Sequence, residues 1–345
     1  MSAVRTAAVV GSTSWGTVLA VMLARNGLAV RLCAYDEADA AALRRDGENA
    51  RLQPGLRFPP SLTVTHASEA ALEGADLLVV AVPSSTLRDN LRALRPHLDP
   101  DTLVLSAVKG LERDTGKRMS QVFQEELTDL RQPLCVLSGP NLSREIARGL
   151  PAATIVAGED LATAEKVRDA FMSPVFRVYT NEDVAGVELA GALKNIIAIG
   201  AGMCDGFAYG DNAKAGFITR GLAEIARLGV AAGAQPLTFL GLAGVGDLMA
   251  TCYSPLSRNH RVGVELAKGL TLDEVLSSLG QVAEGVTTTV AAMNLSRRYG
   301  VEMPITEKTY QVLFEGLDPR RAVAELMLRA PRHELHGVRT GPPAE

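Results

Sequence analysis

The first half of the chain alternates short aliphatic runs with segments of helical periodicity, and this alternation limits the possible folds more than any other feature. Residues 77–82 read LLVVAV, a continuous apolar run typical of a strand buried on both faces of a parallel sheet. Helical segments such as 16–26 and 85–95 separate most of the runs. We therefore expect an α/β domain with a doubly wound, Rossmann-like sheet. The expected strands are 6–10, 28–35, 62–65, 76–82, 102–107, 133–137, 153–157 and 175–179.

The sequence changes character near residue 183, after which no strand pattern occurs. A chain of 345 residues exceeds the size at which one core usually stops growing, so we expect two domains. The first spans residues 1–182, an all-helical second domain spans 183–330, and 331–345 form a flexible tail. The expected helices of the second domain are 184–204, 213–228, 258–268, 271–279 and 287–299.

Charge and cysteine content exclude several classes of function. A net charge of −4 argues against a nucleic-acid-binding surface, although small anionic substrates need only a few placed cations. The four cysteines lie far apart and form no C-x-x-C pair, which argues against a disulfide framework and against a metal site. Buried thiols in a reducing cytoplasm are the simpler interpretation. The cysteines are Cys33, Cys135, Cys204 and Cys252.

Two apolar segments resemble targeting or membrane signals. Residues 5–24 lean apolar like a signal peptide, but the polar residues 12–14 interrupt them, so we expect no secretion. The longest membrane candidate, 184–204, contains Glu188, Lys194 and Asn195. It falls short of the roughly 18 uninterrupted apolar residues of a membrane helix, and we expect a cytoplasmic chain without a membrane span.

The stretch AAVVGSTSWGTVLA, residues 7–20, has the order strand, glycine turn, helix. Gly11 and Gly16 take the first and third glycine positions of G-x-G-x-x-G, while Thr13 takes the middle one. A helix beginning near Trp15 points its first N–H groups at a pyrophosphate. Asp36 ends the second strand, close to where an acidic side chain binds the ribose of a dinucleotide. The alternative is a tight turn in a domain without a cofactor.

Two further strand ends carry candidate residues, because ligands of open α/β sheets bind at the carboxyl ends of the strands. Gly139 follows one strand in LSGPN, with Asn141 placed to cap the next helix. Lys109 follows another strand in SAVKGL. The alternative for the glycine turn is that it only connects two elements of secondary structure. The alternative for Lys109 is a side chain that lies in solvent.

The helix expected at 184–204 is apolar around nearly its whole circumference, so it should be buried. Lys194 and Asn195 lie in its middle. An ammonium is almost never fully buried without a partner, so Lys194 either reaches the surface or faces a polar cleft with a partner. Desolvation in such a cleft lowers the lysine pKa toward a range useful for proton transfer.

A last cluster lies in GLAGVGDLMATCYSPLSRNHRVG. Asp247 stands among small and apolar residues, as a buried carboxylate that needs a cation. Ser257, Arg258 and Asn259 open a helix and bring a hydroxyl, a guanidinium and an amide to its positive end, which suits a phosphate. The alternative is an ordinary helix cap with an exposed arginine.

Taken in order, these segments resemble the NAD(P)-dependent glycerol-3-phosphate dehydrogenases of the bacterial type, from about residue 7 to about residue 316. Five long motifs in the right order carry the resemblance far more specifically than the glycine turn does. The motifs are GVELAGALKNIIAIGAG, GDNAKAGFITRGLAEIARLG, TFLGLAGVGDLMATC, SPLSRNHRVG and QVAEGVTTT.

The resemblance implies a reversible reduction of dihydroxyacetone phosphate to sn-glycerol 3-phosphate, which supplies glycerophospholipid synthesis. It implies NAD(H), with NADP(H) as a second option, no metal, and a homodimer. Lys194 would be the catalytic acid/base, and Asp247 would also orient it. The implied substrate-binding residues are Lys109, Gly139, Asn141, Asp247, Ser257, Arg258 and Asn259. The implied cofactor-binding residues are Gly11, Ser14, Trp15, Gly16, Asp36, Lys109, Ser143, Arg258, Val282 and Glu284.

Two positions depart from the family pattern. Thr13 replaces the usual glycine, and its side chain would crowd a pyrophosphate unless the turn moves outward. Asp36 would repel a 2′-phosphate, so we predict a preference for NADH. Two alternatives stay open: a catalytically silent dinucleotide-binding regulatory protein, and a dehydrogenase of hydroxy acids or sugar acids. The first is disfavoured by the presence of Lys109, Lys194, Asp247 and Arg258 together, and SPLSRNHR speaks against the second.

Overall fold

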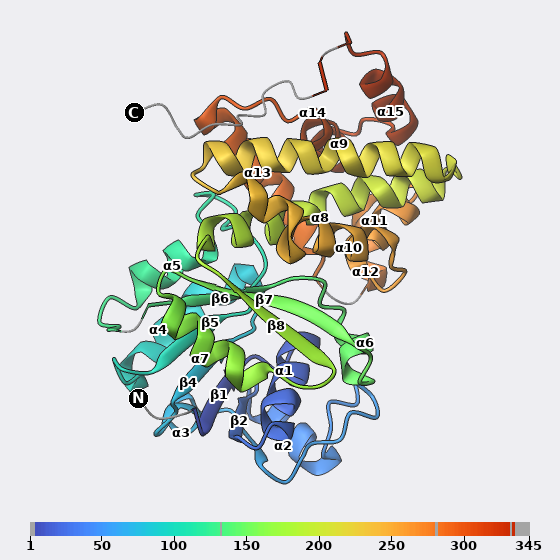
Figure 1. The fold of residues 1–345 in the computed structure, drawn as a ribbon. Helices are drawn as coiled ribbons and strands as arrows, with labels where there is room; N and C mark the ends of the chain where they lie inside the picture. The colour runs from blue at the N-terminus through green and yellow to red at the C-terminus, as the bar shows by residue number, and fades with distance from the viewer. Residues whose placement is uncertain (1–3, 132, 280–281, 332, 335–345) are drawn as a thin grey trace, which may run out of the picture. The chain divides into compact units, whose positions relative to one another are not determined.

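An eight-stranded sheet forms the frame of the first half of the chain (Figure 1). The computed structural model describes residues 4–131, 133–279, 282–331 and 333–334. All eight predicted strands are present, with ends that differ by at most a few residues. They are β1 Thr6–Val10, β2 Ala29–Cys33, β3 Leu62–Thr65, β4 Leu77–Val80, β5 Leu103–Ser106, β6 Cys135–Ser138, β7 Ala152–Gly158 and β8 Phe176–Asn181.

The strand order is β3-β2-β1-β4-β5-β6-β7-β8, so the order reverses between β1 and β4. Ligands of doubly wound sheets bind at such a switch point, outside the carboxyl ends of the strands. One pairing differs from the parallel sheet that the sequence predicts, because β7 runs antiparallel to β6. The chain returns from β6 at the same edge of the sheet, so no crossover is needed.

Helices cover both faces of this sheet, because alternate strand residues point to opposite sides. Ala7 and Val9 of β1 belong to one core, whereas Ala8 and Val10 belong to the other. The helices of the first core are α1 Ser14–Arg25, α2 Glu37–Asp46, α6 Ser143–Ala147 and α7 Leu161–Phe171. Those of the second core are α3 Ser68–Leu72, α4 Leu87–Leu94 and α5 Met119–Glu126. The predicted doubly wound, Rossmann-like fold is confirmed.

The described residues after Val184 contain helices and no strand. The long helices are α8 Val184–Gly206, α9 Gly210–Ala231, α10 Asp247–Tyr253, α11 Arg258–Ala267, α12 Leu272–Leu279, α13 Glu284–Tyr299, α14 Pro304–Phe314 and α15 Pro319–Met327. Short helical turns are η1 Ser84–Thr86, η2 Arg95–His97, η3 Pro236–Leu240 and η4 Leu242–Gly246, the last of π type.

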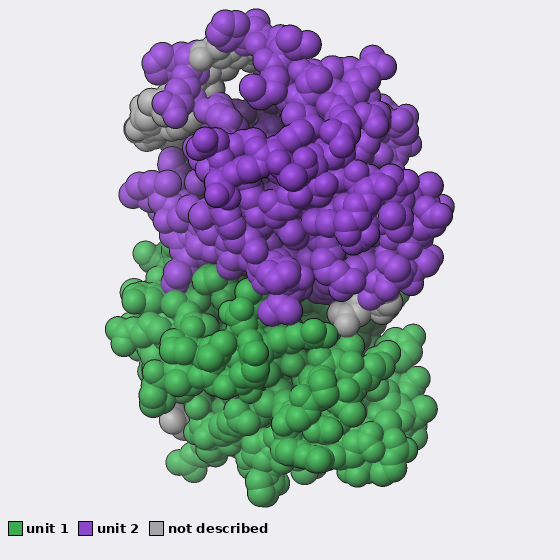
Figure 2. Space-filling model, turned by 90° about the vertical axis from the view of Figure 1, so that its right-hand side faces the viewer, with its two compact units in different colours: residues 1–108, 119–184 green, residues 109–118, 185–345 purple. Residues whose placement is uncertain are grey.

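Contacts divide the chain into two units, which Figure 2 colours green and purple. The sheet unit comprises Met1–Val108 and Met119–Val184, and the helical unit comprises Lys109–Arg118 and Ala185–Glu345. The sequence analysis assigned residues 109–118 to the first domain, and their contacts instead place them in the helical unit. Of the predicted tail, residues 332 and 335–345 lie outside the described residues.

Helix α8 is the centre of the helical unit. Among the described residues, Val184–Gly206 is the one helix long and apolar enough to cross a membrane, but 94% of that window is buried inside the protein. A core helix has this property, as the sequence analysis expected for this segment.

Candidate active site

The glycine turn after β1 is built from two backbone contacts that exclude side chains. Gly11 has a φ of 109°, and a Cβ added there would lie 2.8 Å from the carbonyl oxygen of Ala81. A Cβ added at Gly16 would lie 2.0 Å from the carbonyl oxygen of Gly11. Both positions therefore require glycine, and the turn leaves bare backbone and the start of α1 to face a ligand. This arrangement fits the pyrophosphate of a dinucleotide.

Thr13 lies in this turn but faces the protein. Its φ of −65° needs no glycine, and its side chain forms the N-cap of α1. The Thr13 Oγ1 accepts a hydrogen bond of 3.0 Å from the Gly16 N–H and donates one of 2.8 Å to the carbonyl oxygen of Ala81. The hydroxyl is thus held by the turn itself and by the end of β4.

The predicted cofactor residues Ser14 and Ser143 are brought together from separate helices. Their hydroxyl oxygens lie 2.8 Å apart, and the Gln53 side-chain amide donates to Ser14 Oγ at 2.7 Å. Gln53 is a residue of this site that the sequence analysis missed. Trp15 packs against the core, and its buried Nε1 has no hydrogen-bond partner among the described residues.

Asp36 is exposed and lies three residues after the end of β2, which is shorter than the predicted strand 28–35. Its Oδ1 accepts a hydrogen bond of 2.7 Å from the Asp39 N–H, so Asp36 is the N-cap of α2. The position at the end of the second strand is the one that the sequence predicts for a ribose-binding carboxylate.

The loop after β6 needs Gly139, whose φ is 137° and whose Cβ would lie 3.1 Å from Thr154 Cα. Asn141 does not cap α6 as predicted. Its amide instead donates a hydrogen bond of 2.9 Å to Thr154 Oγ1, and the residue before α6, Leu142, makes no side-chain cap. The antiparallel pairing of β6 and β7 brings Thr154 beside this loop, and the sequence gives no sign of that pairing.

In the helical unit, one carboxylate holds two ammonium groups. Lys194 Nζ lies 2.7 Å from Asp247 Oδ1, and Lys109 Nζ lies 2.7 Å from Asp247 Oδ2. The side chain of Lys194 is 7% exposed and that of Asp247 is 2% exposed, whereas that of Lys109 is 20% exposed. Of the two possibilities left open for Lys194, the structure shows the buried lysine with a partner.

Burial lowers the pKa of Lys194 to about 8, because desolvation disfavours the ammonium more strongly than Asp247 favours it. The second cation, Lys109, lowers this pKa further. A group with a pKa near the working pH exchanges protons readily in both directions, which general acid–base catalysis requires.

Thr251 completes this cluster and was missed by the sequence analysis. The Lys194 ammonium donates to Thr251 Oγ1, and that hydroxyl donates in turn to the Asp247 carbonyl oxygen at 2.7 Å. Thr251 lies four residues after Asp247 on α10, and residues at this spacing share one face of a helix. That spacing is the signal that was overlooked.

The start of α11 lies against α8. Ser257 is its N-cap and accepts from the His260 N–H at 3.2 Å, while Arg258 is exposed. The Asn259 amide donates a hydrogen bond of 2.9 Å to Asn195 Oδ1, and the Gly285 N–H donates one of 2.9 Å to Asn259 Oδ1. The start of α11 is thereby tied both to α8 and to the start of α13. The predicted cofactor residues Val282 and Glu284 lie just before α13 and at its first position, respectively.

Glycines let the backbones of α8 and α11 approach each other closely. A Cβ at Gly263 would lie 1.8 Å from the Ile199 carbonyl oxygen, and one at Gly202 would lie 2.0 Å from the His260 carbonyl oxygen. His260 Nε2 also lies 2.7 Å from Asp205 Oδ2 of α8. Lys194 and the predicted phosphate-binding residues therefore stand on two helices in direct backbone contact.

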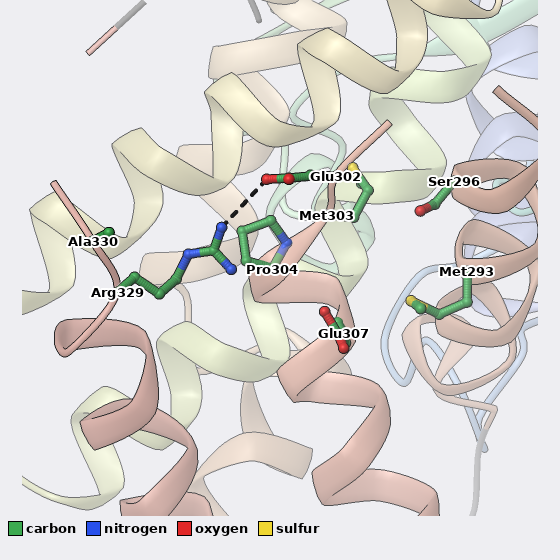
Figure 3. A pocket seen from close by; sticks show the side chains of 8 residues that line it. All are labelled: Met293, Ser296, Glu302, Met303, Pro304, Glu307, Arg329 and Ala330. Atoms are coloured by element: carbon green, nitrogen blue, oxygen red, sulfur yellow. Dashed lines mark hydrogen bonds and ion pairs between the residues drawn. The ribbon is translucent and has the colours of Figure 1, made fainter. Parts of the chain in front are cut away.

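Two cavities of the helical unit include none of the predicted site residues. One of about 430 Å³ lies between α13, α14 and the end of α15 (Figure 3). Arg329 is the one basic residue among its eight described lining residues, and its guanidinium points toward Glu302 at 3.4 Å. A larger groove of about 1630 Å³ follows α9. Neither offers the paired ammonium groups found at Asp247.

The chain is similar to known proteins along most of its length. The family model "NAD-dependent glycerol-3-phosphate dehydrogenase N-terminus" matches residues 6–164, and "NAD-dependent glycerol-3-phosphate dehydrogenase C-terminus" matches residues 183–324. A glycerol-3-phosphate dehydrogenase [NAD(P)+] of Moorella thermoacetica is 51% identical over 328 residues, covering 95% of this chain and 97% of that protein. One of Desulfitobacterium hafniense is 49% identical, covering 96% and 93%.

Among solved structures, glycerol-3-phosphate dehydrogenase from Coxiella burnetii matches with a TM-score of 0.90 and 37% sequence identity, covering 94% of this chain and 99% of that one. These near full-length relatives are dehydrogenases, so they give no support to a catalytically silent regulatory protein. They also carry the names of glycerol-3-phosphate dehydrogenases rather than of hydroxy-acid enzymes. The chain therefore belongs to the family of NAD(P)-dependent glycerol-3-phosphate dehydrogenases.

Proposed function

We propose that Lys194 is the general acid of a reversible, NAD(P)H-dependent reduction of dihydroxyacetone phosphate to sn-glycerol 3-phosphate. One observation carries this assignment: a buried ammonium on α8 shares the Asp247 carboxylate with a second ammonium, that of Lys109. The buried lysine has a pKa of about 8, so it holds a proton at neutral pH and releases it readily. Family membership supplies the reaction.

The proton step follows from the chemistry of the carbonyl group. When bound, the reduced nicotinamide supplies a hydride to the carbonyl carbon. Lys194 gives its proton to the carbonyl oxygen, so that the C=O bond becomes a secondary alcohol and the lysine becomes a neutral amine. Asp247 keeps Lys194 oriented, and the Lys109 ammonium stabilises the negative charge that develops on the oxygen. In the reverse reaction neutral Lys194 takes the proton from the alcohol.

The start of α11 is the proposed phosphate site. Arg258 provides a guanidinium, and the start of α11 provides the positive end of a helix dipole. Ser257 and Asn259 are engaged in holding this helix start, so we assign them a positioning contribution beside any contact with substrate. In the sheet unit, Gly139 and Asn141 shape a loop that we propose to border the substrate.

We propose that the dinucleotide lies on the glycine turn of Gly11 and Gly16. The first turn of α1 would face its pyrophosphate, and Asp36 would bind the adenosine ribose, which favours NADH over NADPH. The remaining proposed contacts are Ser14, Trp15, Lys109, Ser143, Arg258, Val282 and Glu284.

We further propose that the enzyme acts in the cytoplasm as a homodimer and supplies glycerophospholipid synthesis. Four buried thiols without disulfides agree with a reducing compartment. Family membership suggests the dimer.

A spectrophotometric assay of NADH oxidation with dihydroxyacetone phosphate tests the function directly. We expect substrate-dependent oxidation by the wild type and its loss in Lys194→Ala, with Lys268→Ala as the control because Lys268 forms a surface ion pair with Glu265. Absence of oxidation by the folded wild type contradicts the reaction. Full activity of Lys194→Ala contradicts the assignment of the acid.

A further inference from the structure

Residues 109–118 follow β5 of the sheet, yet their contacts assign them to the helical unit (Figure 2). They form a small hairpin that begins at Lys109. Leu111 and Arg118 pair as an antiparallel bridge, and the Glu112 N–H donates 2.9 Å to the Lys117 carbonyl oxygen. The hairpin therefore keeps its two ends close together, so a residue that holds one end also restrains the other.

The tip of the hairpin is attached to α13. Arg298 donates a hydrogen bond of 3.0 Å to the Thr115 carbonyl oxygen. Gly116 has a φ of 69°, and a Cβ added there would lie 3.2 Å from the side chain of Leu295. The tip thus packs closely against the side chain of Leu295 on this helix.

The far end of the hairpin is attached to α8. Arg118 Nη1 lies 2.7 Å from Glu188 Oε2, and the side chains are 23% and 5% exposed. Glu188 precedes Lys194 by six residues on this helix, which is about 9 Å along the axis. A charged pair this well buried, with an arginine as the donor, fixes geometry more firmly than a surface ion pair does.

These attachments oppose the repulsion that would drive Lys109 away from Lys194. Its ammonium shares Asp247 with the Lys194 ammonium, so the two cations repel each other, and the Lys109 side chain has water within reach because it is 20% exposed. A flexible loop would let Lys109 move into solvent. An anchored loop keeps it on the carboxylate.

We propose that residues 109–118 form an anchoring arm of the helical unit, in which Glu188 and Arg298 hold Lys109 against Asp247, so that the lysine pair is assembled before any dinucleotide binds. Glu188 and Arg298 are positioning residues for the active site. The importance of the anchoring arm for catalysis rests on the proposed role of Lys194. Whether the arm holds Lys109 on Asp247 can be measured without turnover.

Competitive acetylation of lysines in the protein without cofactor, read by peptide mass spectrometry, tests the proposal. We expect Lys109 to react at least about tenfold more slowly than Lys268, whose surface side chain is 54% exposed. Because Lys109 is also a proposed cofactor contact, bound NADH can slow its labelling further, so the rate without cofactor decides the test. Labelling of Lys109 as fast as Lys268 without cofactor overturns the proposal.

Variants of the two anchoring residues, Glu188 and Arg298, provide a second test. Glu188→Gln should raise the labelling rate of Lys109 about fivefold or more and lower kcat/KM, while Glu188→Asp restores much of both. Arg298→Gln removes the exposed anchor, so it tests the proposal even if Glu188→Gln fails to fold. Glu325→Gln, which breaks surface ion pairs with Lys308 and Arg321, is the matched control and should leave Lys109 unchanged. Unchanged Lys109 labelling in both folded anchor variants also overturns the proposal.

The labelling result is independent of the reaction. If the dehydrogenase assay fails while Lys109 stays protected, the proposed function is wrong and the arm stands. If turnover is normal while Lys109 labels freely, the arm is wrong and the function stands.

Discussion

The hydroxyl of Thr13 donates a hydrogen bond of 2.8 Å to the carbonyl oxygen of Ala81. This contact joins the turn after β1 to the end of β4, the two strands between which the strand order reverses. A threonine at the middle position of the glycine motif therefore does not need to face the pyrophosphate. It takes over the cap of α1 and stabilises the turn from its protein side.

Thr13→Gly should therefore change the affinity for NADH by less than about threefold, because glycine is itself an acceptable N-cap that costs only a few tenths of a kcal/mol. A fluorescence titration of the protein with NADH measures this affinity. Thr13→Ala serves as the comparison and should cost about 1 kcal/mol of unfolding free energy in urea. A large gain of affinity in Thr13→Gly would show that the threonine obstructs the site.

The pH dependence of kcat/KM should report the proton on Lys194, whose pKa is lowered to about 8 chiefly by desolvation. Reduction of dihydroxyacetone phosphate needs the ammonium, so its kcat/KM should fall as the pH rises through the pKa. Oxidation of glycerol 3-phosphate needs the neutral amine, so its kcat/KM should rise over the same range. Parallel profiles in the two directions are the result that this assignment does not allow.

Asp247→Asn should lower kcat by at least about a hundredfold and also move the pH profile, because the carboxylate orients Lys194 and raises its pKa. With the charge removed, the pKa of Lys194 falls, and the decline of the reduction rate should shift to lower pH. Breaking a buried ion pair also costs about 3–5 kcal/mol, which urea unfolding measures. A pH profile identical to that of the wild type argues against coupling of the two residues.

Thr251→Val keeps the shape of the side chain but removes the hydroxyl that accepts a hydrogen bond from Lys194. Hydrogen bonds to charged groups contribute about 1.5–3 kcal/mol, so kcat should fall by about tenfold or more with a smaller change in KM. Thr251→Ser supplies the control, since it restores the hydroxyl. Equal kcat values for the serine and valine variants would assign Thr251 to packing alone.

Asp36→Ser removes the negative charge but keeps the N-cap of α2, because serine also caps helices well. The wild type should have at least about a tenfold higher kcat/KM with NADH than with NADPH, and the serine variant should narrow that ratio. Asp36→Ala, which loses both charge and cap, shows how much of any change comes from α2. Comparable efficiency of the wild type with both cofactors at matched ionic strength contradicts the prediction.

Much of the fold follows from local patterns. The central strand β4 is an example, because its four residues form a continuous apolar run that is buried in a sheet covered on both faces. The direction of β7 could not be predicted, since burial on both faces is the same for parallel and antiparallel strands. Residues 109–118 contact the helical unit through Arg118 and Arg298, and single arginines in a polar segment do not predict such contacts.

The site was partly predictable for a similar reason. Lys194 and Asp247 are charges in apolar surroundings, and this contrast is visible in the sequence before any contact is known. Thr251 and Gln53 have ordinary polarity, so only the three-dimensional structure shows that their side chains meet Lys194 and Ser14. Asn141 was misplaced because its partner, Thr154, comes from a strand whose pairing the sequence does not reveal.

The backbone contact between α8 and α11 restricts the motions open to this enzyme. Packed helices commonly adjust by sliding along each other, but sliding would carry neighbouring side chains into the places that Gly202 and Gly263 leave for carbonyl oxygens. We therefore expect little shear between these helices, so that the distance from Lys194 to the start of α11 stays constant. If this helix start holds the phosphate as proposed, a substrate must place its carbonyl and phosphate groups at that fixed separation.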